Sequence, residues 1–291
     1  MNYYSSGKLL ITAEYLVLKG AKGLAIPTKY GQKLSVKKNR EGEIIWEAYT
    51  CDNQKWINCK FDLNFKLVKS KKTKTEYIYS LSKLLRKINE LSPGFAGQGL
   101  NISTTLEFNR NWGLGSSSTL INNISNWLNV NPYELLKKTF QGSGYDIGVA
   151  NSKKPIFFQK KGDFNEITET KFSPPFRDNL FFIHLNKKVN SQKEVIKFLN
   201  HKNEFKDDIS KINSLGDMVV KEQNQDNFNE IVKEHEEIIS TIICKKPIQK
   251  TLFKDFSGQI KSLGSWGGDF ILASGDSQTP SYFSNKGYKV I

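Results

Sequence analysis

Apolar and polar residues follow two periods along the first half of the chain, one typical of strands and one typical of helices. Residues 8–18 and 100–108 are rich in apolar and β-branched residues, so we predict strands there. Residues 31–50 alternate on both sides of the sequence NREGE, which predicts a β-hairpin. The helical period covers residues 75–91, where five apolar residues share one face: Ile78, Leu81, Leu84, Leu85 and Ile88.

The rest of the chain predicts one more helix of the first half and then a separate layer of helices and strands. Asn131 followed by Pro132 is typical of a helix start, so we predict a helix over residues 132–140. The remaining elements are predicted as strands at 179–186, 265–274 and 287–291 and helices at 191–199, 205–223, 226–243 and 247–262. This order indicates an α+β protein with an N-terminal lobe at residues 1–155 and a C-terminal lobe at residues 156–291.

Composition narrows the class of protein. The 291 residues include no apolar run close to the ~18 residues that span a bilayer. The N-terminus lacks the basic region and cleavage site of a signal peptide, so we expect a cytoplasmic protein without a membrane partner. The cysteines show no metal-ligand spacing, and their sparse, odd number suits a reducing compartment: Cys51, Cys59 and Cys244.

The chain carries a net charge of +14, which is compatible with an anionic partner or with a lysine-rich surface that has no specific role. The basic residues are spread along the chain, and only KSKKTK at residues 69–74 is dense. No zinc finger, arginine-rich tail or aromatic RNA-binding motif is present, so we do not expect a nucleic-acid partner.

The segment NWGLGSSSTL at residues 111–120 joins a predicted strand to a helix that we expect to begin at Thr119. Glycines in such a connection let backbone N–H groups turn toward a phosphate, and the helix dipole also attracts an anion. The segment matches neither the Walker pattern nor the dinucleotide fingerprint. Taken alone, it is equally typical of a turn with a serine N-cap.

Two further glycine-rich segments favour the phosphate-binding alternative. QGSGYDIGVA at residues 141–150 places Asp146 in a glycine-lined turn, where a carboxylate could accept a proton or simply cap a helix. KSLGSWGGDF at residues 261–270 predicts a third such turn, between a helix and a strand. Together with Lys8 in SSGKLL, these segments suggest a cradle for phosphates.

With these motifs in place, the chain resembles the GHMP kinases, the superfamily of galactose, homoserine, mevalonate and phosphomevalonate kinases. SSGKLLITAEYLVLKG is similar to their first motif, WGLGSSSTL to their second and SLGSWGGDFILA to their third, in the same order along the chain. GSGYDIG resembles the signature of the GYDIA branch, with Gly148 in place of alanine. The resemblance implies an N-terminal lobe of the ribosomal-S5 type, a ferredoxin-like C-terminal lobe and an active site between them.

The resemblance also implies an ATP- and Mg²⁺-dependent kinase. Six residues would hold the ATP phosphates: Gly113, Leu114, Gly115, Ser116, Ser117 and Ser118. Ser117 would contact Mg²⁺, with Ser116 as the next candidate. Asp146 matches the catalytic aspartate and Lys8 the lysine of the first motif. Lys8 would keep Asp146 ionised and stabilise charge on the acceptor oxygen, while Asp146 would accept the hydroxyl proton.

Seven further residues match positions near the acceptor or its reacting phosphate: Glu14, Tyr15, Gly144, Tyr145, Gly267, Gly268 and Asp269. Because tyrosine follows the glutamate of the first motif, as in phosphomevalonate kinases, we expect mevalonate or phosphomevalonate as an anionic small-molecule substrate. The alternatives are a different hydroxyl acceptor, such as a sugar or homoserine, and a catalytically silent nucleotide-binding homologue. We expect a monomer or homodimer.

The chain departs from the family pattern at two places. Trp112 precedes the phosphate loop, where the family usually has proline and small residues. Lys137 and Lys138 lie where mevalonate kinases carry a metal-binding glutamate, and Glu134 is one helical turn away. The second departure leaves open whether a glutamate completes the Mg²⁺ site, and it motivates the silent alternative. A lysine here could contact phosphate directly.

Overall fold

The structure, a computed structural model, describes the chain except for residues 141–142, 163, 189–190 and 201–203. The described chain divides into two compact units, each built from several segments. The first unit comprises residues 1–8, 28–110 and 114–153, and the second comprises residues 9–27, 111–113 and 154–291. The lobes predicted at residues 1–155 and 156–291 stay a prediction about domain boundaries.

The first unit is built on a mixed sheet. Its strands are β1 (Asn2–Leu10), β2 (Gly23–Lys38), β3 (Glu43–Tyr49), β4 (Lys55–Asp62), β5 (Leu67–Ser70) and β6 (Leu100–Leu106). The strand order is β5-β4-β3-β6-β2, and β1 also pairs with β2. Both β1 and β2 cross from one unit to the other along the chain, since their residues 9–10 and 23–27 belong to the second unit.

The pairing of β2 with β3 in a hairpin was predicted and is wrong. Both strands form, but β6 lies between them, antiparallel to β2 and parallel to β3. The turn residue Asn39 bonds to the segment that leads into β6, because its N–H donates to Gly99 O and its side chain donates to Asn101 Oδ1. Alternation along β2 and β3 reports which face is buried, and it does not report which strand is the neighbour.

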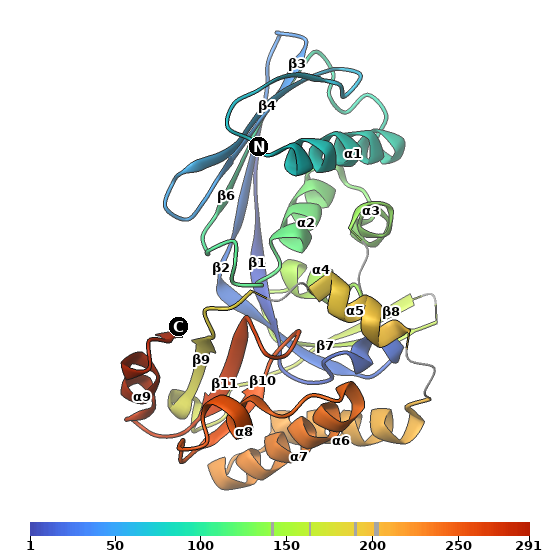
Figure 1. Ribbon diagram of the computed structural model, residues 1–291. Helices are drawn as coiled ribbons and strands as arrows, with labels where there is room; N and C mark the ends of the chain where they lie inside the picture. The colour runs from blue at the N-terminus through green and yellow to red at the C-terminus, as the bar shows by residue number, and fades with distance from the viewer. Residues whose placement is uncertain (141–142, 163, 189–190, 201–203) are drawn as a thin grey trace. The chain divides into compact units, whose positions relative to one another are not determined.

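Four helices belong to the first unit: α1 (Thr75–Leu91), α2 (Ser116–Leu128), α3 (Pro132–Thr139) and α4 (Tyr145–Asn151). Helices α1, α2 and α3 lie on one face of the sheet (Figure 1) and bury Leu84 and Leu85 of α1 with Ile102 of β6 in one core. The predicted helix over residues 75–91 is confirmed, and so is the predicted N-cap of α3, where Asn131 Oδ1 accepts from the N–H groups of Tyr133 and Glu134.

The second unit contains a four-stranded antiparallel sheet of order β10-β11-β9-β12. Its strands are β9 (Leu180–His184), β10 (Gln259–Ser262), β11 (Phe270–Ser274) and β12 (Lys289–Val290). Strands β7 (Ile156–Lys161) and β8 (Phe164–Glu169) pair with each other, and β7 also pairs with residues 23–25 of β2, so both belong to the large mixed sheet. The helices of the second unit are η1 (Leu16–Lys19), η2 (Arg177–Asn179), α5 (Ser191–Leu199), α6 (Lys206–Lys221), α7 (Gln225–Ile243), α8 (Ile248–Leu252) and α9 (Thr279–Asn285). Helices α6 and α7 pack together, and α7 also contacts β10 (Figure 1).

The predicted helix over residues 247–262 is wrong beyond its first turn. Its apolar residues Phe253, Phe256 and Ile260 do share a core, but they reach it from a turn and a strand. The backbone N–H of Ile260 donates to the side chain of Gln249, and β10 pairs with β11. None of the helices in the described parts of the chain has the length and apolar character that crossing a bilayer requires.

Candidate active site

Residues 115–118 form the start of α2 in the first unit. Gly115 is the N-cap with a φ of 86°, a left-handed conformation that glycine adopts without strain. The three serines form the first turn, so the helix begins three residues before the predicted start at Thr119. The N–H of Thr119 donates to Gly115 O at 2.9 Å, which leaves the N–H groups before it available to an anion at the positive end of the helix dipole.

Lys8 and Asp146 form an ion pair beside this helix start, with 3.0 Å between Nζ and Oδ1. Lys8 lies on β1, and Asp146 lies in the first turn of α4. Lys8 Nζ also donates to the hydroxyl of Tyr145 at 2.8 Å, and the N–H of Lys8 donates to Leu114 O at 3.1 Å. The structure therefore brings together the two predicted catalytic residues beside the glycine- and serine-rich start of α2.

The absence of a side chain at Gly115 allows this approach. A Cβ at this position would lie 3.3 Å from Cγ and Cε of Lys8 and 3.7 Å from Oδ1 of Asp146. A side chain here would require the Lys8 side chain to shift slightly, and the left-handed φ of 86° also favours glycine.

Burial and charge set the protonation of this pair. Burial alone would lower the pKa of Lys8, but the charge of Asp146 and the contacts with Tyr145 together outweigh it, so the pKa is raised and Lys8 stays protonated. Burial and the charge of Asp146 raise the pKa of Tyr145, so its neutral hydroxyl accepts the Lys8 hydrogen bond. The site thus offers a carboxylate that can accept a proton beside an ammonium that can balance developing negative charge.

The turn before α4 contains the next two predicted residues. Gly144 is the N-cap of α4 with a φ of 94°, and Tyr145 follows as a buried residue. Gln141 and Gly142 of the predicted QGSGYD turn lie outside the described residues. Gly144 therefore supplies the left-handed conformation that directs Tyr145 and Asp146 into the first turn of the helix.

Trp112 and Gly113, which precede this loop, belong to the second unit. The Trp112 ring lies 5.9 Å from the His184 ring and 6.0 Å from the Phe270 ring, and Lys289 Nζ lies 4.8 Å from its centroid. A Cβ at Gly113 would lie 2.5 Å from Oδ2 of Asp269, so only glycine fits under that carboxylate. The tryptophan that departs from the family pattern is thus an anchor that fixes the start of the loop on β9, β11 and β12.

The glycine-rich segment at residues 261–270 connects β10 to β11, so the predicted turn between a helix and a strand is wrong. Positive φ angles of 56° at Trp266 and 54° at Asp269 place two non-glycine residues in the left-handed region. Such residues cost about 1–3 kcal/mol each and cluster at functional sites. Gly267 also has a positive φ, and Gly268 is buried between Gly267 and Asp269.

Glu14 and Tyr15, the predicted acceptor-side residues, lie in a tight turn of the second unit. Glu14 is fully buried, and its Oε1 is paired with Lys261 Nζ. The hydroxyl of Tyr15 donates to Ser265 O at 2.7 Å, so the turn of the first motif contacts the glycine-rich segment of the third.

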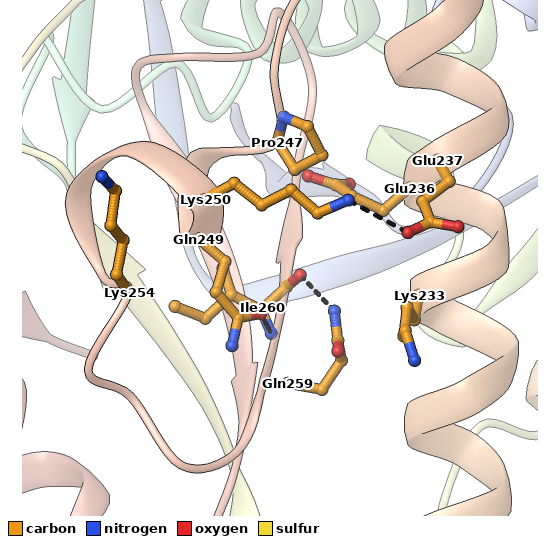
Figure 2. Close-up of a pocket in the computed structure, with 9 residues that line it drawn as sticks. All are labelled: Lys233, Glu236, Glu237, Pro247, Gln249, Lys250, Lys254, Gln259 and Ile260. Carbon is orange, nitrogen blue, oxygen red and sulfur yellow. Dashed lines mark hydrogen bonds and ion pairs between the residues drawn. The ribbon is translucent and has the colours of Figure 1, made fainter.

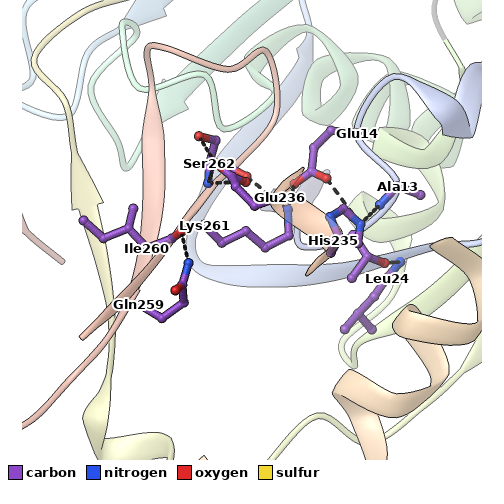
Figure 3. Close-up of polar contacts among 10 residues, drawn as sticks. Ala13, Glu14, Leu24, His235, Glu236, Gln259, Ile260, Lys261 and Ser262 are labelled. Carbon is purple, nitrogen blue, oxygen red and sulfur yellow. Dashed lines mark hydrogen bonds and ion pairs between the residues drawn. The ribbon is translucent and has the colours of Figure 1, made fainter. Parts of the chain in front are cut away.

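Figure 3 shows that Glu14 belongs to a larger network of buried polar groups. Lys261 is 1% exposed and lies between Glu14 and Glu236, while the N–H and hydroxyl of Ser262 donate to Glu236. The N–H of Ala13 donates to Nε2 of His235 at 2.9 Å, which assigns the ring proton to Nδ1. Burial, with the charge of Lys261, holds the pKa of His235 well below its usual range, so this histidine is neutral.

The network has one lysine for two carboxylates. Burial raises the pKa of Glu14 despite its pairing with Lys261. Burial also raises the pKa of Glu236 to about 8, and the nearby charge of Glu14 adds to the shift. Glu236 therefore holds a proton near neutral pH, which leaves Lys261 as the partner of Glu14.

A cavity of about 430 Å³ lies in the second unit, and none of its lining residues is a predicted site residue (Figure 2). It is lined by residues of α7, α8, β10 and the segments that flank α8: Lys233, Glu236, Glu237, Pro247, Gln249, Lys250, Lys254, Gln259 and Ile260. Its charged groups are already engaged in part, because Lys250 pairs with Glu237 and Lys233 pairs with Glu230.

Sequence reasoning missed Lys261, His235 and Glu236. The only signal for Lys261 was its place at the start of the third glycine-rich segment. The other two lie on the helical face of α7, where nothing in the sequence distinguishes a buried charge from an exposed one. Their partners are more than 200 residues away for His235 and 26 residues away for Glu236.

The raised pKa of Glu236 predicts a pH-dependent gain in stability for Glu236→Gln. The folded protein retains a proton on Glu236 that the unfolded chain loses above its usual pKa of about 4.5. Between that pH and about pH 8, this group therefore lowers the free energy of unfolding by about 1.4 kcal/mol per pH unit as the pH rises. Glutamine keeps an oxygen for Ser262 but does not titrate.

Denaturant unfolding of wild type and Glu236→Gln at about pH 6.5 and about pH 8 measures this effect. We expect the variant to gain stability relative to wild type toward the higher pH. The matched control is Glu237→Gln, the exposed neighbour on α7, which should show no such trend. A difference between Glu236→Gln and wild type that does not change with pH would contradict the shifted pKa.

Comparison with known proteins identifies the fold. No protein-family model and no curated protein sequence matches the chain. Among solved structures, it is similar to the phosphomevalonate kinase of Streptococcus pneumoniae in complex with phosphomevalonate and AMPPNP (TM-score 0.73, 14% identity, 100% of this chain and 98% of that chain). It is also similar to the mevalonate kinase of Methanococcus jannaschii (TM-score 0.68, 16% identity, 100% and 96%).

The galactokinase of Lactococcus lactis in complex with galactose is a further structural neighbour (TM-score 0.62, 14% identity, 100% of this chain and 91% of that chain). These three kinases act on different acceptors, and the chain covers nearly all of each. The expected α+β fold of the GHMP kinases is confirmed, and this chain shares that fold over its whole length.

Proposed function

We propose that this protein is a kinase that transfers the γ-phosphoryl group of ATP to mevalonate or phosphomevalonate. The observation that carries the proposal is the Lys8–Asp146 ion pair, which lies beside Gly115 at the N-terminus of α2. A helix N-terminus binds phosphate, and a carboxylate beside it can accept the proton of an attacking hydroxyl. In the first unit, the helix N-terminus and the carboxylate of Asp146 are adjacent.

In the proposed reaction, the acceptor oxygen bonds to the γ-phosphorus as the bond between that phosphorus and the bridging oxygen of ADP breaks. Asp146 takes the hydroxyl proton, and ADP leaves with the bridging oxygen. Protonated Lys8 balances negative charge on the acceptor oxygen, and the N–H groups of Ser116 and Ser117 bind phosphate oxygens. An acceptor that is itself a phosphate has already lost its proton, so it needs Lys8 more than Asp146.

Mg²⁺ fits this site as an ion held chiefly by ATP. It prefers oxygen ligands and keeps several waters, with one or two protein groups. Ser117 is exposed in the first turn of α2, and no hydrogen bond engages its hydroxyl within the described chain. The described residues contain no cluster of three His, Cys, Asp or Glu side chains that could hold a metal. Bound there, Mg²⁺ would neutralise charge on the β- and γ-phosphates.

No carboxylate replaces the expected metal-binding glutamate, because Lys137 and Lys138 stand at that place in the sequence. Lys138 Nζ lies 3.7 Å from Oε2 of Glu90 on α1, and Glu134 is exposed in the first turn of α3. We therefore propose that Ser117 is the protein ligand to Mg²⁺, with no contribution from Glu134.

The choice of acceptor rests on the first motif and on structural neighbours. Tyr15 follows Glu14 as in phosphomevalonate kinases, and a neighbour at TM-score 0.73 binds phosphomevalonate and AMPPNP. The net charge of +14 favours an anionic acceptor. We infer a cytoplasmic monomer or homodimer with no nucleic-acid or membrane partner. A sugar or homoserine kinase is the alternative within the fold, and a silent nucleotide-binding protein is the alternative outside catalysis.

An acceptor panel tests the proposed activity. The protein is incubated with Mg·ATP and mevalonate, phosphomevalonate, galactose or homoserine, and ADP release and product mass are measured. We expect transfer to mevalonate or phosphomevalonate above the acceptor-free rate. Transfer only to galactose or homoserine would refute the choice of substrate, and ATP binding without transfer to any acceptor would support the silent alternative.

Asp146→Asn should lower kcat by about 100-fold or more for a hydroxyl acceptor, with ATP affinity close to normal, because the general base is lost. For a phosphate acceptor the same variant should lose less activity, since no proton has to be removed. Steady-state kinetics with each acceptor, together with ATP titration, measure both effects. Unchanged turnover of a hydroxyl acceptor would exclude Asp146 as the base.

Ser117→Ala should raise the Mg²⁺ concentration needed for half-maximal turnover by about tenfold, the usual effect of losing one contact to a charged group. Ser116→Ala is the matched control on the same turn, and it should change the Mg²⁺ dependence less. If Ser116→Ala has the larger effect, the metal contact belongs to Ser116 instead.

A further inference from the structure

The turn that carries Glu14 is strained on both sides of that residue. Ala13 has a φ of 65° and Tyr15 a φ of 63°, although neither is glycine. Left-handed backbone at residues with a Cβ costs free energy, so it persists only where the surroundings over-determine it. Two such residues on either side of one buried carboxylate indicate that specific contacts hold the turn in this conformation.

Three side-chain contacts hold the turn, one for each of its residues. The N–H of Ala13 donates to Nε2 of His235 at 2.9 Å. The carboxylate of Glu14 is paired with Lys261 Nζ, as Figure 3 shows. The hydroxyl of Tyr15 donates to Ser265 O at 2.7 Å. All three residues of the turn are buried, with exposures of 0%, 0% and 7% in chain order.

The partners of the turn lie on two elements that are otherwise far along the chain. His235 comes from α7, while Lys261 and Ser265 come from the end of β10 and the glycine-rich segment after it. Lys261 Nζ also donates to Ser262 O at 3.1 Å, so the same ammonium fixes its own strand. Glu14 and Lys261 thus join the turn of the first motif to the third motif as one body.

An ion pair is an inefficient way to stabilise such a contact. Lys261 is 1% exposed and Glu14 is 0% exposed, so both charges have lost their hydration. Replacing a buried ion pair by apolar groups is often neutral or stabilising, whereas removing one partner leaves an uncompensated charge. The pair therefore fixes the orientation of the turn more than it stabilises the folded protein, because a carboxylate and an ammonium must meet in a defined geometry.

We propose that Glu14 and Lys261 are positioning residues, whose buried ion pair holds the strained Ala13–Tyr15 turn of the first motif against Ser265 of the third motif. This inference rests on the proposed kinase function. It gives Glu14 a role that acts through the turn, where the family resemblance implied a direct contact with the acceptor. Lys261, which the sequence did not single out, becomes its partner.

The test compares Glu14→Gln, Lys261→Met and the double variant, with Glu237→Gln as a control that breaks the exposed pair with Lys250. Each single variant should lower kcat by about 10- to 100-fold with an unchanged KM for ATP, because the proposed kinase function uses both motifs and a small misplacement far from the chemistry can cost about that much. The double variant should be less impaired than the product of the two single effects. Glu237→Gln should retain the wild-type kcat.

Ala13→Gly separates positioning from folding. Glycine adopts a φ near that of Ala13 without strain, so the turn should then depend less on the ion pair. Ala13→Gly in the Glu14→Gln background should recover about tenfold or more of the lost kcat. The same substitution in the wild-type background should leave kcat unchanged. Loss of kcat in Glu14→Gln without any recovery by Ala13→Gly would overturn the role of the strained turn.

Hydrogen exchange keeps this inference distinguishable from the kinase proposal, since it requires no acceptor. Glu14→Gln should speed amide exchange by about tenfold or more in residues 13–18 and 262–266, while exchange in α2 stays at the wild-type rate. Faster exchange there in a protein without kinase activity would refute the kinase function alone. A variant with lowered melting temperature but wild-type kcat and wild-type exchange at these residues would overturn the inference itself. If Glu14→Gln does not fold, Tyr15→Phe removes the hydrogen bond to Ser265 O and is measured in the same way.

Discussion

An ammonium group that loses most of its hydration needs a carboxylate, and each unit of this protein contains one such pair. In the first unit Lys8 faces Asp146 at the start of α2, and in the second Lys261 faces Glu14 behind a strained turn. Desolvation makes both pairs costly, so each is found where its orientation has a use. The first pair lies at the N-terminus of α2, and the second lies where the first and third motifs meet.

The two pairs differ in what surrounds them. The Lys8–Asp146 pair is open to a ligand, since its side chains retain exposures of 14% and 22%. The Lys261–Glu14 pair is closed, and the neutral His235 and the protonated Glu236 complete its surroundings without adding a second net charge. An open pair can exchange a proton with a substrate, whereas a closed pair can only hold the backbone around it. Their chemistry therefore follows from burial more than from residue type.

Much of the local structure could be predicted from the sequence, because it depends on near neighbours. The helical face of residues 75–91, the Asn131 cap and the helix after GLG are all encoded within a few residues. Strand partners could not be predicted, and neither could the end of the helix after Pro247, since both depend on the insertion of β6 and on the pairing of β10 with β11.

The candidate site shows the same division between local and distant information. The glycine and serine positions and the Lys8–Asp146 pair could be proposed from motifs, whereas the contacts of Trp112 with His184 and Phe270 could not.

The insertion of β6 has a consequence for synthesis on the ribosome. Strands β2 and β3 are synthesised early, but β6, the strand that lies between them, is complete only at Leu106. In the same way, Glu14 is synthesised long before its partner Lys261. Such non-local pairing slows folding, because one edge of β2 and one edge of β3 stay unpaired until residue 106 has been made.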